Sequence, residues 1–304
     1  MAAKRRYKRK GKKLPLSAVI IVILAALAAL AAGYFGKKEP VQVPENTKDL
    51  MVHFIDVGQG DATLIASPDG DTLLIDAGPG SSEDELIAYL DEIGIETIDY
   101  FVLTHPDEDH IGGADLVFSE YTVGSVILPD CEKDTKAYEN LENAISAEEG
   151  CIRRQAAAGS EFTFCQGGTV TVLAPVSQEY DDVNDYSVVL RLDYYATSFL
   201  FAGDAQKTSE YEMIEEWTGG ELDCDVLKVG HHGSTTSSTV AFLNSVTPDL
   251  AVISCGEDNK YGHPHNEIID RFEKEEITVY RTDTEGTVCL VSNGKEVSRF
   301  GKTP

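Results

Sequence analysis

Positive charge is scarce in most of this 304-residue sequence and is concentrated at its N-terminal end. Residues 1–38 hold 10 of the 25 Lys and Arg residues and no Asp or Glu, which leaves 15 basic and all 52 acidic residues, a net charge of −37, in residues 39–304. Such a body repels polyanions except where metal ions or the few cationic side chains reverse the local field. A hydrophobic fraction of 42% and a charged fraction of 25% exclude a disordered, collagen-like or polytopic membrane protein.

Cysteine is also sparse, and no CxxC pair of the kind found in zinc ribbons is present. The six cysteines are Cys131, Cys151, Cys165, Cys224, Cys255 and Cys289. Two arrangements stay open: a disulfide within the group at 131, 151 and 165, or free thiols, which suit the expected strand positions of Cys255 and Cys289. No cysteine stands directly after the apolar N-terminal run, so a lipid-modified N-terminus is not indicated.

A basic segment followed by an apolar run marks the N-terminus. Eight of the ten residues in 4–13 are Lys or Arg, and residues 14–36 carry no charge. Within this run, residues 16–35 would span about 30 Å as a helix, which is the thickness of a bilayer core. The run is longer than the roughly 7–15 apolar residues of a signal-peptide core, so an uncleaved membrane anchor is expected and a cleaved signal peptide is the alternative.

The charge asymmetry predicts the orientation of this anchor. The positive-inside tendency places the basic tail in the cytoplasm and the acidic body outside it, as a single-pass protein of the cell membrane with an extracytoplasmic domain. Residues 37–49 are polar and contain two prolines, which is typical of a linker. The predicted division is a basic cytoplasmic tail (1–13), a transmembrane anchor (14–36), a linker (37–49) and a folded domain (50–304).

Hydrophobic patterning in the folded domain predicts strands followed by helices, twice over. Strands are expected at 51–55, 62–66, 72–76, 98–104, 123–128, 162–164, 169–174, 187–193, 198–202, 226–229, 250–254, 278–281 and 287–292. Helices are expected at 83–93, 135–149, 205–217, 238–245 and 267–275. Because the two halves have a similar order, we expect an α/β fold in which a β-sandwich carries helices on both outer faces.

The segment 104–113, THPDEDHIGG, concentrates potential metal ligands. His105, Asp107, Asp109 and His110 lie within six residues, after the strand expected at 98–104. If the segment is extended, positions 105, 107 and 109 point the same way and 110 faces apart, so it can serve two adjacent metal ions. The alternative is a solvated acidic loop. The distribution of histidines argues against it, because six of the seven fall in three tight pairs.

The three pairs are His105 with His110, His231 with His232, and His263 with His265. The last pair flanks Pro264 at an expected helix start, where one histidine donates a hydrogen bond to substrate or both only cap the helix. The seventh histidine, His53, falls in the first strand and is predicted to line the core or the cleft.

The HxDxDHxGG pattern of this segment resembles the metallo-β-lactamase superfamily, whose usual motif has His where this chain has Asp107. That replacement is similar to the extracytoplasmic hydrolase domain of the ComEC/Rec2 competence proteins of DNA uptake. Further matches follow in the family's order: Phe54–Ala62 (FIDVGQGDA), Leu73–Gly78 (LLIDAG), Asn184–Leu190 (NDYSVVL), Leu200–Asp204 (LFAGD), Leu227–Ser234 (LKVGHHGS), Gly262–His265 (GHPH) and Arg281–Gly286 (RTDTEG). The resemblance covers residues 50–300 and implies an αββα metallo-β-lactamase-like sandwich with two bound metal ions.

The resemblance also implies a role for individual residues. The metal ligands are expected to be His105, Asp107 and Asp204 for the first ion, with Asp109, His110 and His232 for the second. Asp204 would bridge the two ions. His231 would contact the substrate, although which of His231 and His232 ligates stays open. Asp109, His231 and His265 are the expected catalytic residues.

The metal itself follows from the expected ligands. Typical family members supply another histidine near 184–187, where this chain offers only Asn184, Asp185 and Ser187. An oxygen-rich site shifts preference from Zn²⁺ toward Mn²⁺ or Mg²⁺. We therefore expect two divalent ions, Mn²⁺ or Zn²⁺, with a hydroxide bound to metal as the attacking group.

Several other polar residues have expected supporting roles. Asp76 ends a buried strand and would orient a ligand histidine. Asp56 and Asp61 would do the same or cap turns. Lys228, Lys260 and Arg281 lie near motif positions and could reverse the local field for a polyanion. The segment 130–160 is expected to be an insertion near the cleft.

The leading functional prediction is a membrane-anchored, two-metal phosphodiesterase or nuclease of the ComEC-like type. Its expected partners are the membrane and DNA or another phosphodiester, and its protein partners stay unknown. One alternative is a hydrolase of a small ester, thioester or lactone. The other is a metal-stabilised binding module without catalysis.

Overall fold

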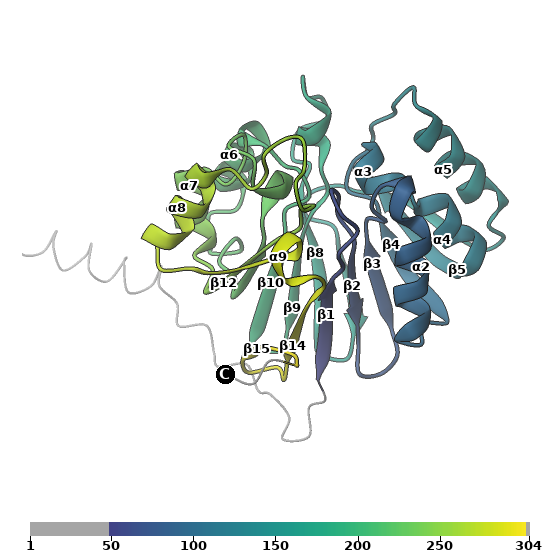
Figure 1. Cartoon of the computed structure of the whole chain (residues 1–304), viewed down its shortest axis with the longest axis horizontal. Coiled ribbons are helices and arrows are strands. Elements are labelled where there is room, and N and C mark those ends of the chain that lie inside the picture. The colour runs from purple at the N-terminus through teal and green to yellow at the C-terminus, as the bar shows by residue number, and fades with distance from the viewer. Residues whose placement is uncertain (1–48, 302–304) are drawn as a thin grey trace, which may run out of the picture. The chain divides into compact units, whose positions relative to one another are not determined.

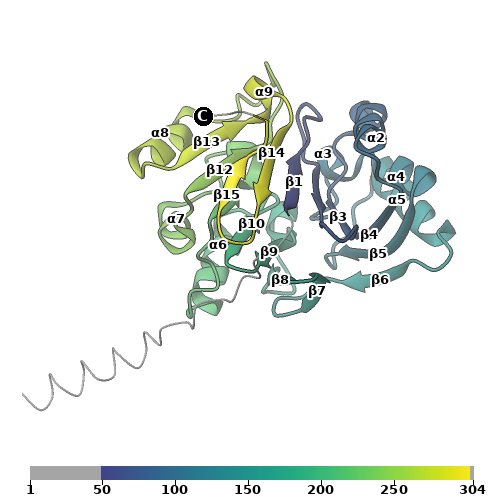
Figure 2. The same cartoon turned by 90° about the horizontal axis from the view of Figure 1, so that it is seen from below.

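The computed structural model describes residues 49–301, which contain two β-sheets packed face to face with helices on both outer sides (Figure 1; Figure 2). This arrangement confirms the sandwich predicted from the sequence. The tail, the anchor and the linker predicted within residues 1–49 lie outside the described residues, apart from Asp49. Within residues 49–301, no helix is both long enough and apolar enough to cross a membrane.

Each sheet changes from antiparallel pairing on one side to three parallel pairs on the other. The first sheet has the spatial order β15 (Val297–Arg299), β14 (Val288–Ser292), β1 (Leu50–Phe54), β2 (Thr63–Ala66), β3 (Thr72–Ile75), β4 (Thr97–Val102), β5 (Thr122–Leu128) and β6 (Ile152–Gln155). The second has the order β13 (Thr278–Arg281), β12 (Leu250–Ile253), β11 (Val226–Lys228), β10 (Thr197–Phe201), β9 (Val189–Tyr194), β8 (Gly168–Ala174) and β7 (Glu161–Cys165).

Helices cover the outer face of each sheet (Figure 2). The first sheet carries α2 (Glu83–Glu92), α3 (Glu108–Ile111), α4 (Ala114–Glu120) and α5 (Lys136–Ala147). The second carries α6 (Lys207–Glu216), α7 (Val240–Val246) and α8 (Asn266–Lys274). Short segments complete the fold: η1 (Gly80–Ser82), η2 (Val183–Tyr186), η3 (Gly230–Gly233) and α9 (Thr282–Glu285).

The central strands are apolar on both faces because both faces are covered. In β2, Ile65 joins the layer between the sheets, and its neighbour Leu64 joins the layer under the helices; both are fully buried. Side chains alternate between the faces of a strand, so a strand buried on both sides is a continuous apolar run. This is why the short apolar runs in the sequence located these strands within one or two residues.

The segment after β4 differs from the prediction. It does not stay extended, since α3 begins at Glu108 immediately after Asp107, and α4 follows Gly113. The helical turn therefore replaces the strand-like alternation that was expected to separate His110 from the other ligands. Two adjacent glycines, Gly112 and Gly113, gave no helical signal in the sequence.

The segment 130–160, predicted as an insertion near the cleft, contains α5 and β6, and its residues Asp130 and Lys133 line surface clefts. Leu141 of α5 is buried against the first sheet, and β6 pairs with β5 at the sheet edge. All four residues of β6 are exposed, so no hydrophobic pattern marked this strand. The six cysteines are free thiols, and no disulfide joins those at 131, 151 and 165.

Truncation of a side chain in the layer between the sheets should be costly. We expect Ile65→Ala to lower the free energy of unfolding by about 2–5 kcal/mol, because it removes buried methyl groups and leaves a cavity. Ile152→Ala is the matched control in the same sheet, since Ile152 is 54% exposed, and it should change the value by less than about 0.5 kcal/mol. Denaturant unfolding measures both, and equal losses would contradict this account of the core.

Candidate metal centre

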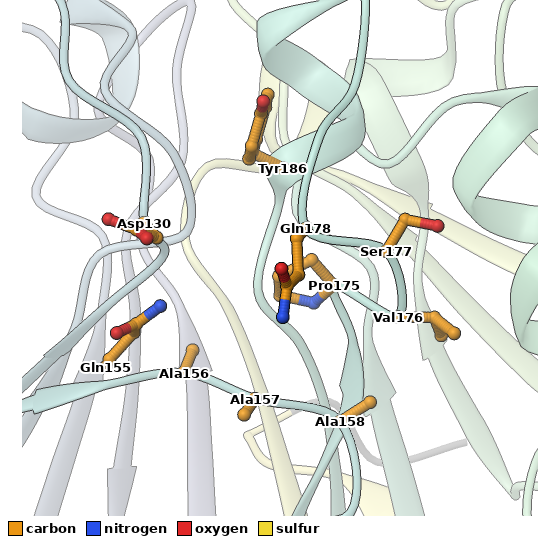
Figure 3. A pocket seen from close by; sticks show the side chains of 10 residues that line it. All are labelled: Asp130, Gln155, Ala156, Ala157, Ala158, Pro175, Val176, Ser177, Gln178 and Tyr186. Carbon is orange, nitrogen blue, oxygen red and sulfur yellow. The ribbon is translucent and has the colours of Figure 1, made fainter.

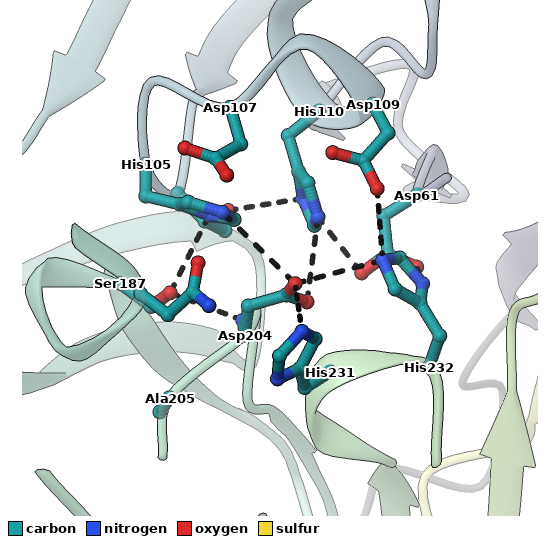
Figure 4. A network of polar contacts seen from close by, with 12 residues as sticks. Asp61, His105, Asp107, Asp109, His110, Ser187, Asp204, Ala205, His231 and His232 are labelled. Atoms are coloured by element: carbon teal, nitrogen blue, oxygen red, sulfur yellow. Dashed lines mark hydrogen bonds and ion pairs between the residues drawn. The ribbon is translucent and has the colours of Figure 1, made fainter. Parts of the chain in front are cut away.

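The polar cluster forms where strands of both sheets end. Asp76 directly follows β3, and His105 lies three positions after the end of β4. Asp204 and His232 follow β10 and β11 of the second sheet. Because β3 runs parallel to β4, and β10 to β11, the carboxyl ends of each pair lie at one edge. The two edges meet, and the side chains of both sheets converge (Figure 4).

The turn into α3 brings two predicted ligands together. The backbone N–H groups of His110 and Ile111 both donate to the carbonyl of Asp107, at 3.0 Å. This turn places the ring of His110 beside that of His105, with ring centroids 4.2 Å apart. His110 therefore faces the same cluster as His105, in contrast to the extended segment expected from the sequence.

Close backbone packing holds the surrounding loops in place. A Cβ on Gly60 would lie 2.4 Å from the carbonyl oxygen of Asp109, and one on Gly112 would lie 2.2 Å from the backbone nitrogen of Gly80. Only glycine permits these approaches. The N–H of Asp61 donates to the same Asp109 carbonyl at 3.1 Å. The GQGD loop after β1 is therefore joined directly to α3.

Asp204 is the carboxylate at the centre of the cluster (Figure 4). Its Oδ1 lies 3.3 Å from His110 Nε2, and its Oδ2 lies 4.0 Å from His105 Nε2. The same Oδ2 lies 3.5 Å from His232 Nε2 and 3.7 Å from His231 Nε2. Burial raises the pKa of Asp204, but the charges of His232 and His110 outweigh it and hold the pKa well below its usual value.

A second carboxylate faces His232 from the other side. Asp109 Oδ2 lies 3.4 Å from His232 Nε2. Burial raises the pKa of Asp109, but the contact with His232 and the charge of His110 lower it to about 2. Burial likewise lowers the pKa of His232, but Asp204 and Asp61 raise it to about 10. The carboxylates therefore create a site that favours a bound positive charge.

Within the described part of the chain, four groups of three side chains are close enough to hold a metal ion. They are His105, His110 and Asp204; Asp109, His110 and His232; Asp61, Asp204 and His232; and Asp61, Asp76 and His110. Asp204 and His110 each belong to more than one group, so the groups form one continuous cluster.

Several ligand atoms in this cluster lack a hydrogen-bond partner. The Nε2 atoms of His105, His110 and His232 are buried and unpartnered, and so is Oδ1 of Asp204. Leaving such atoms unpaired in a protein interior costs free energy. Converging nitrogens and a carboxylate oxygen match the donors that bind Zn²⁺ or Mn²⁺, so these residues fit a metal centre.

The other ring nitrogen of each of these histidines is held by the protein. Nδ1 of His110 lies 2.7 Å from Asp76, which also accepts hydrogen bonds from the backbone N–H and the hydroxyl of Thr104 at 2.7 Å. Nδ1 of His232 donates to the carbonyl of Ser254 at 3.0 Å. These contacts fix the tautomer that directs Nε2 into the cluster, as is usual for metal-binding histidines.

His105 has a weaker set of outer contacts. Its Nδ1 lies 3.1 Å from the Thr104 hydroxyl and 3.5 Å from that of Ser187. Burial, together with the neighbouring charge of His110, lowers the pKa of His105 to about 3. The ring is therefore neutral near pH 7, the form in which histidine binds metals.

Asp61 and Lys228 are a part of the cluster that sequence reasoning left undecided. Both side chains are buried, and the Lys228 ammonium contacts the Asp61 carboxylate directly. Asp61 also lies 3.5 Å from Nδ1 of His232. The sequence had suggested that Lys228 could meet a polyanion. The buried contact with Asp61 shows that it is not free to do so. Asp61 lies in the GQGD motif and Lys228 in the LKVG motif. Their opposite charges, in two segments expected near the site, are the signal from which this pair could have been predicted.

Asp107 points to a different partner. Its Oδ1 lies 2.6 Å from Nζ of Lys133, in the segment between β5 and α5. Asp107 belongs to none of the groups described above. Its assignment as a metal ligand therefore stays a prediction. The pair with Lys133 joins residues 26 positions apart, and nothing in the sequence indicated it.

The second histidine pair is held in an unusual backbone conformation. His231 and His232 have φ values of 50° and 52°, in the left-handed region. This turn directs both rings toward Asp204. The remaining nitrogen of His231 lies 2.8 Å from the Thr236 hydroxyl, and the His231 side chain keeps 21% of its surface exposed. His232 is the buried member of the pair.

The other residues singled out in the sequence belong to none of the four groups, and one of them, His53, contacts no member of the cluster within the described residues. His265 precedes α8, and its Nδ1 accepts a hydrogen bond from the Thr235 N–H at 3.1 Å. Asp185 accepts hydrogen bonds from two backbone N–H groups at the start of α6. The Ser187 hydroxyl accepts the Asp204 N–H at 3.0 Å, so it positions the central carboxylate. His53 lies in β1, 2.7 Å from the Tyr89 hydroxyl, and is remote from the cluster.

Among the cavities formed by residues 49–301, a cleft and a smaller cavity lie in the loops at this end of the sheets. A cleft of about 440 Å³ is lined by Asp107, Asp109, Lys133 and Tyr261, among others. A separate cavity of about 310 Å³ lies between the end of β6 and the loop after β8 (Figure 3). Tyr186, which directly precedes Ser187, lines the second cavity.

Comparisons with known proteins agree with this geometry. The family model of the metallo-beta-lactamase superfamily matches residues 55–257. ComE operon protein 3 of Bacillus subtilis is 31% identical over 78% of this chain and 32% of that protein. Recombination protein 2 of Haemophilus influenzae is 34% identical over 78% of this chain and 28% of that protein. The chain therefore spans about a third of the length of these curated relatives.

A solved structure shows the same fold. The metallo hydrolase Igni18 from Ignicoccus hospitalis superposes with a TM-score of 0.53 at 18% identity, and the match covers 79% of this chain and 98% of that one. The family model matches well over half of the sequence and spans most of the segments that supply the cluster. The chain belongs to the metallo-β-lactamase superfamily.

Proposed function

We propose that this chain is a metal-dependent phosphodiesterase that cleaves single-stranded DNA or a related phosphodiester. The observation that carries the proposal is the convergence of three buried, unpartnered imidazole nitrogens on the carboxylate of Asp204. A folded protein retains such a costly arrangement when a cation completes it.

The proposed ligands are His105, His110, His232, Asp109 and Asp204. These side chains supply three nitrogens and two carboxylates, a set suited to two divalent ions, Mn²⁺ or Zn²⁺. Asp204 presents one oxygen to His110 and the other to His232, which suits a carboxylate shared between two ions. Asp107 is left out of this set because its Oδ1 contacts Lys133 and it belongs to none of the four groups.

The metal ions would polarise the phosphoryl oxygens and activate water for attack. The chain's own residues prepare this reaction. Asp76 and Ser254 hold two of the histidines in the required tautomer, and Ser187 fixes the backbone of Asp204. Asp109, at the wall of the larger cleft, is placed to orient the attacking water. His231 has an exposed edge beside Asp204 and is placed to contact the substrate.

Phosphodiesters are favoured over small esters by two considerations. A pair of metal ions stabilises both the attacking and the leaving oxygen of a phosphoryl displacement. In addition, one relative is named a recombination protein, which associates that protein with DNA. We further propose that residues 14–36 anchor the chain in the cell membrane and that residues 50–304 lie outside the cytoplasm.

The full chain should bind about two divalent ions. We expect His110→Ala and Asp204→Ala each to reduce metal content, and to reduce the rise in melting temperature on adding Mn²⁺, because bound metal adds folding free energy. His53→Ala, a buried histidine remote from the cluster, is the control. Elemental analysis after desalting measures the content, and parental occupancy in both variants would refute the ligand assignment.

Asp109→Asn tests the chemistry. The substitution keeps the shape of the side chain but removes the charge that faces His232. With Mn²⁺ we expect the parent to cleave single-stranded DNA and the variant to lose about 10²-fold or more in rate, the scale seen when a key transition-state stabiliser is removed. His53→Ala should lose much less.

The same assay separates the alternatives when metal and salt are held constant. Equal rates in the parent and Asp109→Asn would indicate a contaminating nuclease. Activity on esters or thioesters alone would move the assignment to a small-ester hydrolase. Full metal occupancy without activity on any substrate would indicate a binding module.

The proposed topology predicts protease sensitivity in intact cells. Protease added outside should digest the domain at 50–304 and leave the anchor at 14–36 associated with the membrane, because the basic segment favours the cytoplasmic side. Immunoblotting with antibodies to each part gives the readout. Complete protection of the domain until the cells are lysed would show that the orientation is wrong.

A further inference from the structure

The cleft beside Asp109 has two walls from distant parts of the chain. One wall consists of α3 with Lys133, and the other is the loop after β12, which contains Asn259, Lys260 and Tyr261. The cleft measures about 440 Å³, enough for a group the size of a nucleotide. Because Asp109 belongs to both the cleft wall and the metal cluster, a group bound here lies next to the reacting centre.

A row of rings leads from this cleft to the cluster. Tyr261 is 51% exposed, and its ring stacks on His263 with centroids 5.6 Å apart and an interplanar angle of 22°. The ring of His263 in turn lies 6.2 Å from that of His232 at 26°. The rings are close to parallel, so the half-exposed ring of Tyr261 continues a stack that begins at a proposed ligand.

The loop that carries Tyr261 is held firmly by Asn259. The side-chain amide of Asn259 donates to the carbonyls of Gly256 and His263, at 2.9 and 2.6 Å. Its oxygen accepts the N–H groups of Tyr261 and His263, at 3.2 and 3.0 Å. The side-chain amide of Asn259 thus forms all of its hydrogen bonds within this loop. These bonds hold the exposed ring of Tyr261 in a fixed position.

Each carboxylate that lines the cleft has a partner of its own. Asp107 is paired with Lys133, Asp109 faces His232, and Glu108 accepts the Gly80 N–H at 3.0 Å. Within residues 49–301, Lys260 has no carboxylate partner and instead lies 4.8 Å from the centre of the Tyr261 ring. A free cation next to an exposed aromatic ring is notable in a body that carries a net charge of −37.

The cavity of about 310 Å³ lacks these features. Its lining includes Asp130, Gln155 and Gln178 but no Lys, Arg or His side chain (Figure 3). It therefore offers no cationic side chain to a phosphate.

We propose that the larger cleft binds one nucleotide of a single-stranded nucleic acid, with its base stacked on Tyr261 and a phosphate at Lys260. The proposal rests on the phosphodiesterase function proposed above and deepens it. Single-strand-binding proteins combine a cationic track with aromatic stacking, which tolerates any base. A duplex keeps its bases paired and stacked, so the cleft selects single strands.

The test uses the full chain with bound Mn²⁺ and two labelled oligonucleotides of equal length. One carries normal bases and the other is abasic, so the phosphates are the same in both. Phosphorothioate linkages resist cleavage and permit measurement of the dissociation constant by fluorescence anisotropy, whereas ordinary linkages report cleavage. The variants are Tyr261→Ala, Tyr261→Phe and Lys260→Gln. The control is Tyr211→Ala, since Tyr211 is an exposed tyrosine on α6 with Lys207 5.8 Å from its ring centre.

We expect Tyr261→Ala to weaken binding of the normal strand by about 5- to 150-fold, the range for loss of one base stack, with no change for the abasic strand. Tyr261→Phe and Tyr211→Ala should bind both strands like the parent. Lys260→Gln should weaken both strands, because it removes a phosphate contact. Equal binding of the two strands by the parent, or equal weakening of both in Tyr261→Ala, would overturn the proposal.

Cleavage separates this proposal from the one on which it rests. If the parent cleaves both strands without a preference for bases, the phosphodiesterase function stands and the stacking site is refuted. If the parent binds the normal strand better but cleaves neither, the stacking site stands and the phosphodiesterase function is refuted.

Discussion

The buried carboxylate of Asp204 and the histidines that face it are the interaction on which the site depends. Placing a carboxylate between two packed sheets is costly unless positive charge surrounds it. Here that charge comes from His232, which follows β11 of the second sheet, and from His110 of α3 beside the first sheet. Both sheets must therefore be correctly packed for the cluster to form. The sandwich is therefore the scaffold that allows residues from positions 105 to 232 to share one carboxylate.

The outer contacts of the histidines explain why so many buried polar residues accompany this carboxylate. Asp76, Thr104 and Ser254 have no direct contact with Asp204, yet they determine which nitrogen of each histidine faces it. Burial raises the pKa of Asp76, which the neighbouring His110 opposes, so the two side chains stabilise each other only as a pair. The same logic applies to Asp61 and Lys228, whose opposite charges are buried together.

The sequence predicted the layers well because strands covered on both faces are continuous apolar runs, such as β2 and β10. It also located the histidine clusters, because motif residues at strand ends are close in space when the strands run parallel. The sequence did not predict contacts that depend on how the backbone turns or on which distant segments meet in the fold. The helical turn of α3, which turns His110 toward His105, had no signal in the sequence, because the two adjacent glycines Gly112 and Gly113 do not favour a helix. The pairing of Asp107 with Lys133, and that of Asp61 with Lys228, join segments whose separation carries no local signal.

The central claim is that the cluster around Asp204 holds two divalent ions, and anomalous X-ray diffraction tests it most directly. Crystals grown with Mn²⁺ and measured at its absorption edge should show two anomalous peaks beside Asp204, each about 2.1 Å from the Nε2 atom of at least one of His105, His110 and His232. A map at full Mn²⁺ saturation with no peak within bonding distance of these nitrogens would contradict the account.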